Sequence, residues 1–177
     1  SAYVLVALVV LIIVMSMLSP QFLTDGNVKN IIRNFSFVAI ATLGITLVII
    51  TGGIDLSVGS TMALSASVCS LAMAGLTASG FYPFPGSIFI LSMLAGLGTA
   101  LVIGLVNGFA VAKLKLAPFV TTLGTLSIVR GLTYVVTQGR GSAPSGPDKE
   151  LFMHLMSGNL GGVPVGFIYL IVLAAAA

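Results

Sequence analysis

The chain has 177 residues, of which 58% are hydrophobic and only 6% are charged. Soluble domains carry roughly 25% charged residues, so this composition excludes a water-covered globular fold. The formal net charge of +3 comes from scattered lysines and arginines, and these form no basic patch for nucleic acid. We therefore predict an all-α membrane protein, a polytopic bundle of transmembrane helices.

The first two predicted spans follow from uncharged runs, since a helix of about 20 apolar residues crosses a bilayer. Residues 2–18 contain no charge, and Ser19-Pro20 ends this run because proline disfavours helix at the residue before it. A polar stretch, 21–33, comes next, where Asn27 is a candidate N-cap. Residues 34–54 then form the second uncharged run and contain a Gly-Gly stop near their end.

Residues 56–112 contain no charged residue, and this run is too long for one span. Two glycines and two prolines punctuate it over 79–86. This break predicts a third span near 56–78 and a fourth near 87–112. Lys113 and Lys115 close the fourth span.

Pro118 opens the fifth predicted span, which runs to about Val136. A polar loop rich in glycine and proline is expected over 138–164, and a sixth span begins near Val165. The sequence thus predicts about six spans in a single transmembrane domain over 1–177. Because the last apolar run stops at its end, we expect a fragment.

The lysines also predict an orientation. Lys113 and Lys115 belong to a very short loop, which the positive-inside rule places in the cytoplasm. Counting spans then puts the N-terminus inside and the loop 138–164 outside. In that loop Asp148 and Glu150 are expected to form a solvated charge cluster.

A row of small residues predicts where helices pack. Within the fourth predicted span small residues recur every four positions, at Gly96, Ala100, Gly104, Gly108 and Ala112. Gly59 begins a similar row in the third span. Such rows let helix backbones approach closely, either in ordinary bundle packing or beside a moving pathway.

The most distinctive segment joins the second and third spans, at 51–60. A glycine pair can end one helix, and Asp55 can accept hydrogen bonds from the first N–H groups of the next. The alternative is that this carboxylate faces a pathway or a partner, because an acidic residue between apolar spans is often functional.

At this segment the chain resembles the ribose-type permeases of bacterial ABC importers. The family's Gly-Ile-Asp-Leu-Ser-Val-Gly-Ser string stands at 53–60. Three further stretches match in the same order, at 43–49, 106–108 and 118–125. The resemblance covers essentially the whole chain.

The resemblance implies a permease subunit in the bacterial inner membrane that translocates a monosaccharide such as ribose, xylose or galactose. Its expected partners are a second permease subunit, identical or different, two cytoplasmic ATPase domains, a periplasmic or lipid-anchored sugar-binding protein, and membrane lipid. No cofactor is expected in this chain. The family's loop that couples to the ATPase lies in a second half that this sequence lacks.

Six polar residues are candidates for the pathway or a hinge: Asp55, Ser57, Asn107, Thr121, Thr122 and Arg130. For each a structural role is open beside the functional one. Asn107 can bond between helices, the threonines can bond back to their own helix, and Arg130 can cap carbonyls or snorkel. A sugar pathway also needs such neutral hydroxyl and amide groups.

Other functions find less support in the residues. No phosphate-binding loop occurs, His154 has no second His or Cys nearby for a metal, and no catalytic set can be assembled. We therefore expect neither an enzyme nor a metal site. The alternatives are a secondary transporter or channel, a structural membrane subunit, or an ABC permease for branched-chain amino acids or nucleosides.

Overall fold

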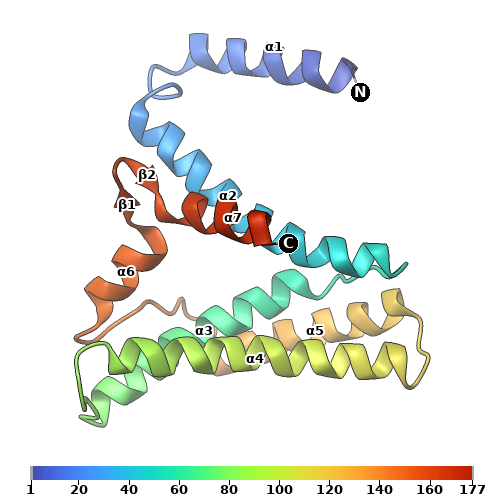
Figure 1. Ribbon diagram of the computed structural model, residues 1–177, viewed down its shortest axis with the longest axis vertical. Coiled ribbons are helices and arrows are strands. Elements are labelled where there is room, and N and C mark those ends of the chain that lie inside the picture. The colour runs from blue at the N-terminus through green and yellow to red at the C-terminus, as the bar shows by residue number, and fades with distance from the viewer. Residues whose placement is uncertain (1, 177) are drawn as a thin grey trace. The chain divides into compact units, whose positions relative to one another are not determined.

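The computed structural model describes residues 2–176, and Figure 1 shows its elements in chain order. Over this range the helices and strands are α1 (Ala2–Leu18), α2 (Asp25–Ile50), α3 (Val58–Ala78), α4 (Ser87–Ala112), α5 (Pro118–Thr137), α6 (Lys149–Ser157), β1 (Asn159–Leu160), β2 (Val163–Pro164) and α7 (Val165–Ala176). The described residues form two compact units. Unit 1 comprises 2–40 and 157–176, and unit 2 comprises 41–156.

The prediction of an all-α membrane protein is confirmed, with a smaller number of full-length spans. Four helices are long and apolar enough to cross a membrane: α2, α3, α4 and α5. The apolar helices α1 and α7 occupy the places of the first and sixth predicted spans but are shorter.

The predicted N-cap at Asn27 was wrong, because α2 already begins at Asp25 within the polar stretch. Thr24, not Asn27, caps this helix: its Oγ1 accepts from the N–H of Asn27 at 3.4 Å. An ion pair between Lys29 and Asp25, 2.6 Å apart and four residues along the helix, supports the first turns. Polar residues therefore extend α2 beyond its uncharged run.

The expected loop over 138–164 also contains regular structure. It holds the helix α6 and an antiparallel ladder in which Asn159 pairs with Pro164 and Leu160 with Val163. Gly161 and Gly162 connect the two strands with φ of 58° and 85°, the left-handed pair that a two-residue hairpin turn requires. These two glycines therefore form the turn of a tight hairpin within the segment.

The core of unit 2 lies between α3, α4 and α5, with α3 packing against both of the others (Figure 1). Its buried apolar side chains are Leu64, Cys69, Met73, Ile88 and Val129. The helices α3 and α4 approach closely at Gly96, where a Cβ would lie 2.9 Å from the carbonyl oxygen of Ser65. This contact is the kind that the small-residue row predicted.

The other predicted packing glycines, Gly59 of α3 and Gly104 and Gly108 of α4, lack the close contact found at Gly96. A Cβ placed at Gly59, Gly104 or Gly108 would meet no other part of the described chain within 4 Å. Ala100 and Gly104 instead border a cavity beside α4. Within residues 2–176, the expected close packing at Gly59, Gly104 and Gly108 is therefore absent, and these positions border open space.

Asp148 is not the solvated residue that the sequence suggested, since only 4% of its surface is exposed. Its Oδ1 accepts from the hydroxyl of Tyr82 and the N–H of Gly86, both at 3.0 Å. Its Oδ2 accepts from the N–H of Phe89 at 3.1 Å. Burial by itself raises the pKa of Asp148, but the three hydrogen bonds outweigh it and hold the pKa below its usual value. Glu150 is exposed, as expected.

Candidate functional site

The segment between α2 and α3 begins with a helix stop. Gly52 has a φ of 79°, and its N–H donates to the carbonyl of Ile49 at 2.9 Å. The N–H of Gly53 donates to the carbonyl of Val48 at 3.1 Å. The left-handed glycine satisfies the last carbonyls of α2, as at many helix C-termini. The chain is thereby turned toward α3.

Asp55 then organises the entry into α3. Its Oδ1 accepts from the backbone N–H of Ser57 at 2.7 Å and from the hydroxyl of Ser57 at 2.6 Å. Ser57 is the N-cap residue, and α3 starts at Val58. Asp55 therefore holds the N-cap residue in place by an Asx turn and does not accept from the first helical N–H groups themselves.

Asn107 of α4 continues this arrangement across the helices. Its Nδ2 donates to Oγ of Ser57 at 2.9 Å, and its Oδ1 accepts from Oγ1 of Thr125 on α5 at 2.6 Å. Ser57 is 1% exposed and Asn107 7%. We call the chain Thr125, Asn107, Ser57, Asp55 the polar relay. It links α5, α4 and the start of α3 through four side chains.

The relay has one consistent hydrogen-bond direction. The single hydroxyl proton of Ser57 is committed to Asp55, so this oxygen can only accept from Asn107. The amide of Asn107 is thereby fixed with its nitrogen toward Ser57 and its oxygen toward Thr125. Each donor points along the chain toward the one carboxylate. Buried networks satisfied in this way favour one arrangement of the helices that carry them.

Thr122 provides a second link between α5 and the loop. Its Oγ1 lies 3.1 Å from the carbonyl oxygen of Ile54 and 2.9 Å from that of Pro118 in its own helix. The side chain is buried, with 4% of its surface exposed. The hydroxyl is shared between the two carbonyls, which holds the loop against the first turn of α5.

A cavity of about 520 Å³ opens beside the relay, within the range of roughly 300–1,000 Å³ typical of ligand pockets. Asp55, Asn107 and Thr122 supply polar groups to its wall. The small residues Gly104 and Gly108 of α4 lie on the same wall. Gly104 and Gly108 therefore border a cavity, where the sequence predicted that another helix packs.

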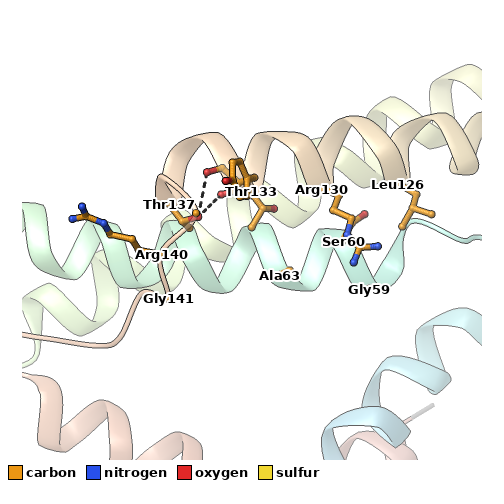
Figure 2. A pocket seen from close by; sticks show the side chains of 11 residues that line it. Gly59, Ser60, Ala63, Leu126, Arg130, Thr133, Thr137, Arg140 and Gly141 are labelled. Carbon is orange, nitrogen blue, oxygen red and sulfur yellow. Dashed lines mark hydrogen bonds between the residues drawn. The ribbon is translucent and has the colours of Figure 1, made fainter.

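Two candidates lie apart from the relay. Thr121 donates to the carbonyl of Ala117 in its own helix at 3.1 Å. Arg130 lines a separate cavity of about 620 Å³ between α3 and α5. Figure 2 shows it beside Gly59 and Ser60, with Arg140 toward the other end of that cavity. The structure therefore groups Asp55, Ser57, Asn107 and Thr122, and leaves Thr121 and Arg130 outside.

Thr125 is the relay member that the sequence-based candidate set omitted. Thr125 lies three residues from Thr122 and four from Thr121, so it shares a helix face with each of them. The Oγ1 atoms of Thr121 and Thr125 both also reach back to helix carbonyls. Spacing along α5 therefore does not tell which of these hydroxyls meets Asn107.

Residues 27–177 match the family described as branched-chain amino acid transport system / permease component. The chain belongs to this permease family. It is 41% identical over 169 residues to the probable ABC transporter permease protein y4mJ of Sinorhizobium fredii, covering 94% of this chain and 46% of that protein. It is 36% identical to the ribose import permease protein RbsC of Haemophilus influenzae, covering 90% and 47%.

A third relative is the galactose/methyl galactoside import permease protein MglC of Salmonella typhimurium, 35% identical over 78% of this chain and 42% of that protein. The resemblance to ribose-type ABC permeases is thereby confirmed. The permease chain spans about half the length of the curated relatives it matches. No solved structure matches it.

The role of Asp55 in this permease can be tested by two substitutions. Asp55→Asn keeps an oxygen that can accept both bonds from Ser57, so the start of α3 should be nearly unaffected. Asp55→Ala loses both bonds and should cost roughly 1 kcal/mol of stability, as for other helix caps. We expect Asn to retain partial transport and Ala to retain less. Uptake normalised to the membrane level of each variant checks this, and wild-type uptake in both would leave Asp55 without a role.

Proposed function

We propose that this chain is part of the membrane-spanning subunit of an ATP-driven ABC importer that translocates a monosaccharide. The observation that carries the proposal is the similarity, over 90% of the chain, to a protein named as a ribose import permease. The relative named for galactose and methyl galactoside import supports a sugar as substrate. Which monosaccharide is carried is left open within the ribose-, xylose- and galactose-like class.

The chemistry of the cavity beside the relay supports a neutral polyol. Its polar lining comes from hydroxyl, amide and backbone groups and from Asp55, the one charged residue among those that border it. A zwitterionic amino acid could pair its ammonium group with Asp55, but its carboxylate would meet no cation in this lining. A sugar hydroxyl can exchange hydrogen bonds with Asn107 or Thr122 without such a penalty.

The proposed assembly contains a second permease subunit, two cytoplasmic ATPase domains and an external sugar-binding protein. The ATPase domains supply the energy, because this chain carries no phosphate-binding loop. We place this part of the subunit in the inner membrane with six crossings, of which the first contains α1 and the sixth begins with α7.

The proposed orientation makes a prediction about accessibility. Cysteines introduced one at a time at 113–115 should resist a membrane-impermeant maleimide in intact spheroplasts, whereas cysteines at 140–146 should react. The reason is the lysine pair in the short loop between α4 and α5, which favours the cytoplasm. Labelling at position 115 together with protection at position 145 would reverse the proposed orientation.

A deletion of the gene in its own bacterium tests the proposed substrate class. We expect loss of high-affinity uptake of one labelled monosaccharide, restored by the wild-type gene, with leucine uptake unchanged. Loss of leucine uptake with all monosaccharides unaffected would instead favour a branched-chain amino acid permease.

A further inference from the structure

A short segment closes one end of the α3–α4 pair. Residues 143–156, here called the lid, run from an extended stretch into the helix α6. Three contacts hold the lid to that end. The carboxylate of Asp148 binds the N-terminus of α4, the rings of Phe152 and Phe89 meet edge to face at 6.1 Å, and Gly146 lies against Thr77.

The lid borders an apolar cavity of about 380 Å³ between α3 and α4. Pro144, Phe152 and Met156 of the lid border this cavity together with Cys69 of α3 and Met93 of α4. Cys69 is 6% exposed, and its sulfur lies 4.0 Å from that of Met93. The other side of α6 is exposed and carries Lys149, Glu150 and His154 together with Leu151 and Met153.

The carboxylate of Asp148, which we call the latch, caps α4 from a distant part of the sequence. Gly86, the N-cap residue of α4, has a φ of 88°, and its N–H donates to Asp148. The N–H of Phe89 also donates to this carboxylate, which thus satisfies two of the amides that a helix leaves open at its start. A buried anion at this positive end of the dipole is favoured further.

The same residue is also placed to cap its own helix. The N–H of Phe152 donates to the backbone carbonyl of Asp148 at 2.9 Å, and α6 begins at Lys149, so Asp148 occupies the N-cap position of α6. Its side chain is turned instead toward α4. If that side chain rotates, its carboxylate can leave the N-terminus of α4 and cap the N-terminus of α6 instead. Aspartate is among the best N-cap residues. The latch can therefore be released without leaving the carboxylate unpartnered.

We propose that residues 143–156 form a latched lid, in which Asp148 switches between capping α4 when the cavity is closed and capping α6 when it is open. Gly139 and Gly141 precede the lid, with a φ of 69° at Gly139, and Gly158 follows it. These glycines give both ends of the segment the backbone freedom that a hinge uses. Release of Asp148 would uncover the cavity and uncap α4 in one step.

Cys69, the only cysteine of the chain, serves as the reporter. The full-length subunit in detergent is treated with N-ethylmaleimide, and modification of the Cys69 peptide is followed by mass spectrometry. We expect slow modification of wild-type protein and a rate roughly 10- to 100-fold higher in Asp148→Ala, because hydrogen bonds to a charged group are the strong ones. Glu150→Gln, which alters an exposed carboxylate of the same helix, should modify at the wild-type rate.

Fast labelling of Cys69 in wild-type protein, equal rates in wild-type and Asp148→Ala, or equal acceleration by Glu150→Gln would overturn the proposal. Hydrogen exchange on wild-type protein gives an independent test should Asp148→Ala fail to fold. The amides of Gly86 and Phe89 should be protected by the same opening equilibrium that limits modification of Cys69, because release of Asp148 frees both. Persistent protection of Gly86 and Phe89 while Cys69 is modified would show that the cavity opens without release of Asp148.

Discussion

Replacing Asn107 by leucine should remove most sugar uptake while the subunit still reaches the membrane. Leucine has the same branched shape but neither donates to Ser57 nor accepts from Thr125. Ser57 keeps its bond to Asp55, and Thr125 can still donate to the carbonyl of Thr121 at 3.1 Å. We therefore expect the free energy of unfolding to fall by roughly 1–3 kcal/mol, and the subunit should still fold. The link between α4 and its neighbours is lost, and uptake should fall about tenfold or more.

Asn107→Asp sharpens this prediction because it keeps the shape of the side chain. An aspartate needs a proton from Ser57, whose single hydroxyl proton is already used by Asp55. Two carboxylates would then face one hydroxyl, so this variant should transport no better than Asn107→Leu. Thr99→Val on the same helix is the matched control, since the hydroxyl of Thr99 bonds only to its own helix at Ala95. Near-normal uptake by Asn107→Asp would mean that the relay does not govern transport.

Gly96→Leu should be the most destabilising single change in the α3–α4 contact. Even a Cβ at this position would lie 2.9 Å from the carbonyl oxygen of Ser65 and 3.2 Å from the Cβ of Cys69. Because a backbone carbonyl cannot rotate away as a side chain can, the helices must separate. Overpacking of this kind costs about 1–3 kcal/mol, and the longer side chain adds to it. We expect a melting temperature in detergent that is several degrees lower.

Gly98→Leu is the control for this measurement. It lies two residues along the same helix, and a Cβ there meets nothing within 4 Å. Both substitutions gain about 0.8–1.0 kcal/mol of helix propensity, so any difference between them reports the α3 contact. Equal melting temperatures for the two variants would show that α3 and α4 do not approach at Gly96.

The helix limits that follow from chemistry within a few residues could be predicted from the sequence. α4, α5 and α7 begin where expected, and α1 and α4 end where expected, before Ser19-Pro20 and Lys113. α2 begins earlier because its capping threonine and ion pair stabilise a polar first turn. Uncharged runs report the part of a helix that lies in lipid, and they say little about how far it extends into water.

Contacts between distant segments could not be predicted in the same way. The sequence predicts a solvated acid at Asp148, beside Lys149 and Glu150, whereas its side chain caps a helix that begins more than 60 residues earlier. The small residues on α4 are likewise evenly spaced, but they lie in two different environments. Gly96 faces α3, and Gly104 borders the cavity near Asp55. Spacing alone does not tell which neighbour a face meets.

The measurement that tests the central claim most directly is uptake by the reconstituted importer. Full-length subunit, its ATPase and its binding protein are placed in liposomes containing ATP, and labelled ribose, xylose, galactose and leucine are supplied in turn. We predict ATP-dependent accumulation of one monosaccharide, no accumulation of leucine, and loss of the sugar signal with Asn107→Leu. Accumulation of leucine alone, or sugar entry that does not depend on ATP, would contradict the assignment.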